Sequence, residues 1–119
     1  MGYTNISFYL KLYRIHVFVD SLRGIGSPKR ICFMLSEDGN ILLITPYLKR
    51  DLKSHNVPDK AYSGEGGLEI SSYKLCGIIA NRHGWNPGQS YRVPGVVYQD
   101  KKIAAFDLTK AELIGKRNR

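Results

Sequence analysis

The clearest local signal in the sequence is the stretch SSYKLCGIIANRHGWNPG, residues 71–88. Ser71 or Ser72 can cap a helix, since a serine oxygen accepts hydrogen bonds from the first free N–H groups. Gly84 can take the positive φ that ends many helices, and 86–88 then form a turn. Apolar residues at helical spacing predict one buried face of this helix: Leu75, Cys76, Ile78 and Ile79.

Strand-like runs flank this helix on both sides. Each run is short, rich in β-branched or aromatic residues and bounded by turn residues. The turn at 37–40 contains Gly39, which can adopt the positive φ of a hairpin. The chain is therefore expected to be mainly β with short helices (α+β). The runs expected to be strands are 30–35, 41–45, 91–93, 96–98 and 103–106.

The first part of the chain predicts a similar order. Polar and apolar residues alternate over 6–17, which indicates one long strand or two strands in register. Asp20 is expected to cap a short helix that buries Leu22 and Ile25. Gly26-Ser27-Pro28 is expected to end that helix.

Size and composition favour one domain, residues 1–119, with a small core. An apolar content of 43% is ordinary for a folded protein and argues against wholesale disorder. Residues 47–67 carry many charges and few aliphatic side chains, so we expect a mobile connection there, with a helical turn at 48–55. The basic tail 115–119 is expected to be flexible.

Several patterns are missing from the sequence. No apolar run approaches the roughly 20 residues that span a bilayer, and the start does not read as a secretory signal. A cytoplasmic location without a membrane partner is therefore expected. Cys32 and Cys76 lie in apolar runs, which predicts buried reduced thiols. Because His16, His55 and His83 lack ligand spacing, neither a metal nor a cofactor is expected.

The chain is strongly basic. Eighteen Lys and Arg against ten Asp and Glu give a formal charge of +8. A small basic domain attracts polyanions, with nucleic acid first and an acidic protein or anionic ligand second. The alternative is that the surplus charge only keeps the protein soluble.

The order of elements recurs along the chain. Residues 6–46 and 68–108 each predict strand, short helix, strand and strand, separated by the connection 47–67. Neither half can cover its own strand edges. We therefore expect two intertwined halves, in which each half covers the edges of the other.

Two sets of residues link this repeat to a known pattern. In the first half they are Arg14-Ile15-His16-Val17, Leu22-Arg23, Ile25-Gly26 and 31–46. In the second half they are Ile70, Leu75, 84–88, 91–93 and 103–108. The pattern resembles the AbrB-type (SpoVT/AbrB-like, MazE-like) swapped-hairpin domain. The resemblance implies a single-chain, pseudo-dimeric swapped-hairpin barrel, and it implies a DNA-binding regulatory protein.

The resemblance also implies which residues contact duplex DNA. Arg14 and Arg23 match the family's basic positions, and guanidinium groups bind phosphates or read guanine edges. Glu69 stands where the family has arginine, which makes the implied face asymmetric or lost. The alternative is that these charges protect a strand edge from aggregation. The other candidates are Lys11, Lys29 and Arg30 nearby, and Arg82, Arg92, Lys101 and Lys102 in the second half.

A second function class fits the same composition. A small phage or mobile-element protein could bind a host protein or sequester an anionic ligand, as an anti-defence inhibitor does. A structural assembly module and a homo-oligomer are further alternatives. No enzyme is expected, because the carboxylates fall at predicted caps, turns and strand ends. Tyrosines that can either stack on bases or pack on the sheet are Tyr9, Tyr13, Tyr91 and Tyr98, and Trp85 is expected in the core.

Overall fold

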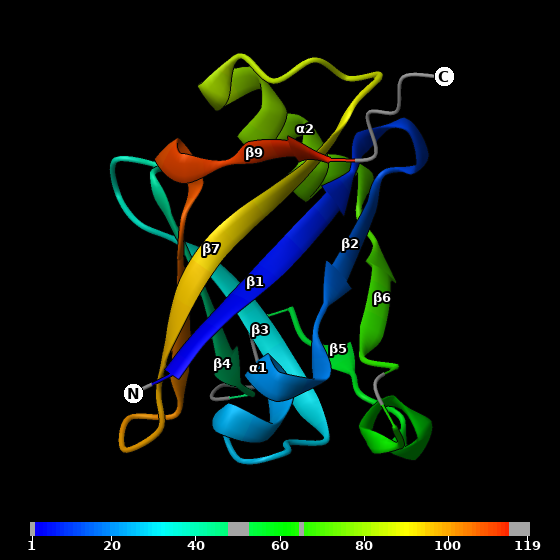
Figure 1. The fold of residues 1–119 in the computed structure, drawn as a ribbon, viewed down its shortest axis with the longest axis vertical. Coiled ribbons are helices and arrows are strands. Elements are labelled where there is room, and N and C mark those ends of the chain that lie inside the picture. The colour runs from blue at the N-terminus through cyan, green and yellow to red at the C-terminus, as the bar shows by residue number, and fades with distance from the viewer. Residues whose placement is uncertain (1, 48–52, 65, 115–119) are drawn as a thin grey trace.

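The computed structural model, which describes residues 2–47, 53–64 and 66–114, is mainly β (Figure 1). One antiparallel sheet curls into a nearly closed barrel in the order β5-β3-β4-β8-β7-β1-β2-β6, with β9 paired to β7. The strands are β1 Gly2–Tyr9, β2 Arg14–Val17, β3 Arg30–Leu35, β4 Ile41–Pro46, β5 His55–Asn56, β6 Leu68–Ser71, β7 Ser90–Tyr98, β8 Ile103–Asp107 and β9 Glu112–Ile114. The helices are α1 Val19–Gly24 and α2 Tyr73–His83, with 3-10 turns η1 Leu10–Leu12, η2 Asp59–Tyr62 and η3 Leu108–Lys110.

The interior of the barrel is filled by alternate residues of its strands. Because successive strand residues point to opposite faces, each strand sends every second side chain inward. Phe8 from β1 and Phe106 from β8 are the largest fully buried side chains. Ile15 of β2 and Ile44 of β4 are equally inaccessible. Burial of these apolar groups is the main favourable term in the stability of the fold.

The two α-helices lie at opposite ends of the barrel (Figure 1). At one end α1 buries Leu22, and Ile25 just beyond it is also buried. At the other end α2 buries Cys76 and Ile79. Neither α-helix of the described residues is long and apolar enough to cross a membrane.

The prediction for α2 is confirmed at both ends of the helix. Ser72 is the N-cap, and its Oγ accepts a hydrogen bond from Leu75 N at 3.1 Å. Gly84 ends the helix with φ of 66°. The predicted buried face is wrong in part, because Ile78 is 47% exposed. Only a narrow face of α2, with Cys76 in it, contacts the barrel end.

Trp85 packs in the core beside the end of α2, as expected. It is 9% exposed, and its ring meets that of Phe8 edge-on with centroids 5.4 Å apart. Tyr91 stacks on its other side at 4.6 Å, and the Tyr91 hydroxyl accepts a hydrogen bond from Asn86 N. The aromatic cluster therefore joins the turn after α2 to the start of β7.

The first part of the chain forms two strands rather than one. β1 and β2 pair antiparallel, with Ile6 opposite Val17, and η1 connects them. Asp20 is not the helix cap that was expected, since Phe18 occupies the N-cap without a side-chain hydrogen bond. Asp20 instead accepts a hydrogen bond from Thr4 of β1 at 2.8 Å. This bond fastens α1 to the first strand.

The predicted strands 91–93 and 96–98 are one continuous strand, β7. Residues 90–92 of β7 pair with β9, and residues 95–98 pair with β8. Pro94 lies between these two partners, where the ladder on that side is interrupted. A proline, which cannot donate a backbone hydrogen bond, is tolerated at such a gap.

The segment expected to be a mobile connection, 47–67, packs against the barrel where it is described. It contains β5 and η2, and it places Val57 and Ala61 in the core. The Tyr62 hydroxyl donates a hydrogen bond to the carbonyl of Pro28. The helical turn expected at 48–55 lies outside the described residues up to residue 52, and the tail 115–119 also lies outside them.

Both cysteines are free and buried, as predicted, and this makes a test of the core. Burial raises the pKa of the Cys76 thiol from 9.0 to about 11. Because the thiolate is the reactive species, this raised pKa lowers the thiolate fraction about a hundredfold. In a Cys32→Ala variant at about pH 8, we expect Cys76 to react with Ellman's reagent at least about a hundredfold more slowly in the native protein than in guanidinium. Equal rates in the two conditions would contradict the burial of Cys76.

Candidate nucleic-acid interface

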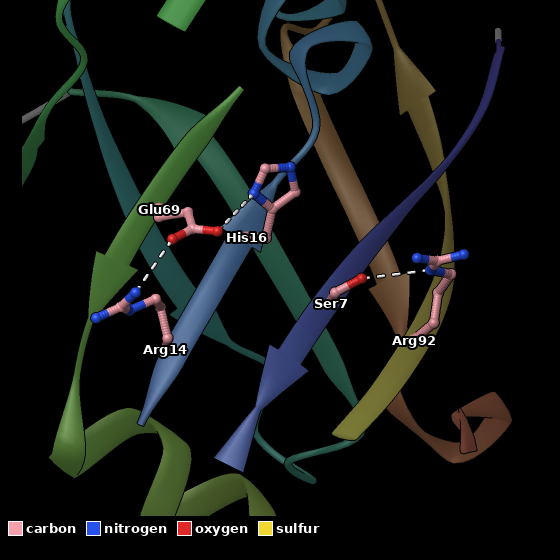
Figure 2. A network of polar contacts seen from close by, with 5 residues as sticks. All are labelled: Ser7, Arg14, His16, Glu69 and Arg92. Carbon is pink, nitrogen blue, oxygen red and sulfur yellow. Dashed lines mark hydrogen bonds and ion pairs between the residues drawn. The ribbon is translucent and has the colours of Figure 1, made fainter. Parts of the chain in front are cut away.

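A row of polar side chains crosses the outer face of four neighbouring strands (Figure 2). Strand pairing sets His16 of β2 opposite Glu69 of β6, and it sets Ser7 of β1 opposite His16. On the other side of β1, Ser7 is opposite Arg92 of β7. The sheet therefore brings together residues that are far apart in the sequence.

Glu69 pairs with the first of the predicted DNA-binding arginines. Its carboxylate lies between Arg14 and His16, with Arg14 Nη1 3.5 Å from Oε1 and His16 Nδ1 3.5 Å from Oε2 (Figure 2). The Arg14 and Glu69 side chains are 44% and 49% exposed, so the pair contributes at most about 1 kcal/mol to stability. The carboxylate nevertheless offsets part of the charge that Arg14 presents to a phosphate.

Arg92 is held on the same face by two contacts. Its Nε donates to the Ser7 hydroxyl at 3.3 Å, and its guanidinium lies 5.4 Å from the centre of the Phe18 ring. The His16 ring meets Phe18 edge-on at 4.7 Å. These contacts fix the direction in which Arg92 points while leaving the residue exposed.

The order Ser7, His16, Glu69 across three strands invites comparison with a nucleophilic triad. Such a triad requires the histidine to accept the serine proton. Here the fully buried Ser7 hydroxyl accepts a hydrogen bond from Arg92, and His16 presents Nε2 to Gly67 rather than to Ser7. The geometry therefore does not prepare Ser7 for attack.

Arg82 has a structural partner. It donates a hydrogen bond to the carbonyl of Asp38 in the β3–β4 hairpin, and the next residue, His83, places Nε2 2.9 Å from the carbonyl of Gly39. Hydrogen bonds from Ser36 and the backbone of Asn40, and the charge of Arg82, lower the pKa of Asp38. Arg82 thus fastens the hairpin to α2.

The remaining predicted residues gather around α1. Arg23 donates from Nη2 to the carbonyl of Tyr62 at 2.6 Å, which joins α1 to η2. Arg30 donates from Nε to Ser54 Oγ at 2.8 Å, and its guanidinium lies 6.0 Å from the centre of the Tyr47 ring. Both arginines remain exposed.

Lysines from other segments reach the same end of the barrel. The β7–β8 hairpin carries Lys101 and Lys102 to the end where α1 lies (Figure 1). A Cβ on Gly26 would lie 3.7 Å from Cδ of Lys102, so that side chain passes the loop between α1 and β3. We call the combined set the α1-end cluster: Arg23, Lys29, Arg30, Lys60, Lys101 and Lys102.

Most of the sequence-predicted residues therefore fall into two groups at opposite ends. Lys11 and Arg14 lie in η1 and at the start of β2, and Arg82 lies in α2, whereas Arg23 lies in α1 and Lys29 and Arg30 follow it. Arg92 of β7 lies between the two groups, since its guanidinium contacts Phe18 at the start of α1. Sequence reasoning assigned Lys60 to the connection and missed its place in the α1-end cluster. The Arg23–Tyr62 bond that places η2 beside α1 has no local sequence signal.

Ion pairing distinguishes the two groups. In the part of the chain that the structure describes, ion pairs within 4.0 Å involve one carboxylate, that of Glu69. Asp20, Asp59 and Asp100 are near the α1-end cluster but form no such pair within the described residues. The charge of that cluster is therefore not cancelled by direct contact.

The tyrosines proposed for stacking behave differently from one another. Tyr91 packs on Trp85, and Tyr9 is half-buried. Tyr13 is 45% exposed and meets the exposed Tyr73 edge-on at 4.7 Å. Tyr98 is 39% exposed. Packing on the sheet thus accounts for Tyr91, while Tyr13 and Tyr98 keep accessible rings.

Comparison of the chain with protein-family models, with curated proteins and with solved structures gives no match. The functional argument therefore depends on the geometry and charge described above.

Proposed function

We propose that this protein is a duplex-DNA-binding regulator of the AbrB-like type, which contacts phosphates through the α1-end cluster. The observation that carries the proposal is the convergence of Arg23, Arg30 and four lysines without a carboxylate in ion-pair contact among the described residues. Cations that neutralise phosphates release counterions, and this release dominates the affinity of most DNA-binding proteins.

The strand pairing supports the pseudo-dimeric part of the proposal. The order strand, helix, strand, strand occurs twice, as β2-α1-β3-β4 and as β6-α2-β7-β8. The first strands of the two units, β2 and β6, pair antiparallel, and so do their last strands, β4 and β8. Such pairing of corresponding strands is what a fused swapped-hairpin dimer requires.

The two halves differ in charge, which makes the proposed face one-sided. α1 and its neighbours carry the cationic cluster, whereas Glu69 offsets Arg14 beside the β6 strand. A carboxylate near phosphates reduces affinity. The proposed DNA contact therefore uses one end of the pseudo-dimer. This agrees with the position of Glu69, which stands where the AbrB-type pattern has an arginine.

Salt dependence tests this assignment. Binding of a labelled duplex, followed by fluorescence anisotropy between about 50 and 200 mM salt, should weaken with a log–log slope near −0.9 for each phosphate contact. Replacing Lys29, Arg30, Lys101 and Lys102 together with glutamine should reduce the slope by about 3 and the affinity by at least about a hundredfold. Absence of duplex binding at low salt would end the proposal.

A matched variant separates a specific face from general charge. The fourfold replacement of Lys11, Arg14, Lys74 and Lys110 with glutamine removes the same formal charge elsewhere on the molecule. We expect this control to change the slope by less than about 1. Equal losses in the two variants would show that only net charge attracts DNA, and would contradict the assigned face.

A further inference from the structure

The barrel wall is incomplete between β3 and β6. On that side, β3 pairs with β5 only at Arg30 and Ile31, and β6 pairs with β2 alone among the described strands. The part of β3 beyond Ile31, which includes Phe33, therefore faces the start of α2 across an opening. A cavity of about 460 Å³ lies there, which we call the seam pocket. This volume is within the range of about 300–1,000 Å³ typical of small-molecule sites.

The inner side of the seam pocket is apolar. Phe33 of β3 and Leu75 of α2 line it, and both pack against the hydrophobic core. Ile78, which is exposed on α2, lines it from the helix. Ile78 therefore lies outside the core but forms part of the apolar wall of the seam pocket.

The polar lining of the seam pocket is cationic and hydroxylic. Lys53, two residues before β5, and Lys74 of α2 both line it, together with Ser71 at the end of β6 and Tyr73 at the start of α2. The described lining residues include no aspartate or glutamate. An acidic group entering the pocket would therefore meet positive charge and hydrogen-bond donors from these described lining residues.

The pKa of His55 reflects its burial and the positive charge around the seam pocket. Its ring lines the pocket and meets Phe33 edge-on at 5.4 Å. Burial, followed by the charges of Lys53 and Arg30, lowers the pKa of His55. Desolvation alone would lower it, but the two cations add to the effect because they oppose a third positive charge. An anion in the pocket would relieve this repulsion.

We propose that the seam pocket binds a small organic anion with a flat apolar body. Lys53 and Lys74 engage the acidic group, and Phe33, Leu75 and Ile78 contact the apolar body. A phosphate ester of a nucleoside and an aromatic carboxylate share this chemistry. The site is separate from the α1-end cluster, since none of the cluster residues lines the pocket, and it does not depend on the proposed DNA contact.

The fluorescent aromatic sulfonate ANS provides a direct test. We expect ANS to bind the native protein with enhanced emission, and the double variant Lys53→Gln/Lys74→Gln to weaken that binding at least about tenfold. The matched variant Lys101→Gln/Lys102→Gln removes the same charge from the α1-end cluster and should change binding less than about twofold. Equal weakening in the two variants would overturn the proposal.

A second pair of variants tests the apolar wall and does not remove cations. Ile78→Glu places a carboxylate on an exposed helix position that lines the pocket, and Gln99→Glu adds the same charge on the distant β7–β8 hairpin. Only Ile78→Glu should weaken ANS binding, again by about tenfold or more. Circular dichroism of each variant checks that the fold is retained. Unchanged binding in a folded Ile78→Glu variant would contradict the site.

Competition identifies the source of the anion. Displacement of ANS by AMP but not by adenosine supports a phosphate ester, and displacement by 2-naphthoate but not by naphthalene supports an aromatic carboxylate. If neither AMP nor 2-naphthoate displaces ANS while the protein remains folded, the pocket takes neither a phosphate ester nor an aromatic carboxylate, and the proposal fails.

Discussion

The substitution Phe106→Ala should lower the free energy of unfolding by about 3–5 kcal/mol. Phe106 is fully buried, and its register in β8 sets it opposite Leu42 of β4 and Gly95 of β7. Alanine removes the burial of the ring and leaves a cavity, because neighbours fixed in a barrel wall collapse only in part. Urea denaturation of the two proteins measures the difference.

An aromatic residue on the surface provides the control for Phe106. Tyr3 of β1 is 84% exposed, so Tyr3→Ala removes a similar ring without opening a cavity. We expect a loss of less than about 1 kcal/mol, mainly from strand propensity. A loss below about 1 kcal/mol for Phe106→Ala as well would mean that the barrel interior is not packed around this ring.

The second large effect is expected at Gly95. A Cβ at this position would lie 2.4 Å from Cδ2 of Phe106 and 2.7 Å from the carbonyl oxygen of Ala105. The carbonyl belongs to the paired strand β8, so rotation of a side chain cannot relieve that contact. Gly95→Ala should therefore destabilise the protein by about 1–3 kcal/mol or more, as overpacking of cores does. Urea denaturation again provides the measurement.

The same chemical change elsewhere should have the opposite sign. Gly77 lies in the middle of α2, is exposed, and has no atom within 4 Å of where a Cβ would be. Gly77→Ala should stabilise the protein by about 0.5–1 kcal/mol, because alanine costs less backbone entropy in a helix. If Gly95→Ala changed the free energy of unfolding no more unfavourably than Gly77→Ala does, the close approach of β7 and β8 would be refuted.

Local signals were sufficient for α2 and the β3–β4 hairpin. Ser72 and Gly84 terminate the helix through contacts within a few residues, and Gly39 takes the positive φ of 76° that its turn requires. These features depend on chain chemistry that is present before any tertiary contact forms. The same holds for the strand 30–35, whose bounds match β3.

Expectations failed where a distant partner decides the outcome. Asp20 was expected to cap α1, but Thr4, sixteen positions earlier, supplies its hydrogen bond. Ile78 has the spacing of a core residue, yet a helix that closes a barrel end buries only a narrow face. The break expected at Pro94 is absent, since β1 pairs with β7 along its whole length.

The candidate sites depend even more on tertiary pairing. Arg23 and Lys102 come from segments that only the folded barrel brings to one end. Lys53 and Lys74 share the seam pocket because β3 and β6 remain unpaired with each other in the described residues. Charge composition indicated an anionic partner, but only the order of strands places the cations.

The pairing of β1 with β7 also has a consequence for biosynthesis. Tyr3 is opposite Val96, and Ser7 is opposite Arg92. The first strand to be synthesised therefore cannot pair with β7 until most of the chain has been made. Contacts of such wide sequence separation make folding slow, because closing the long intervening loop costs entropy before the contacts can form. While the ribosome is still extending the chain toward Tyr98, the apolar face of β1 has no cover. The barrel is therefore expected to form in a late, cooperative step, and nascent chains are expected to need chaperone protection until then.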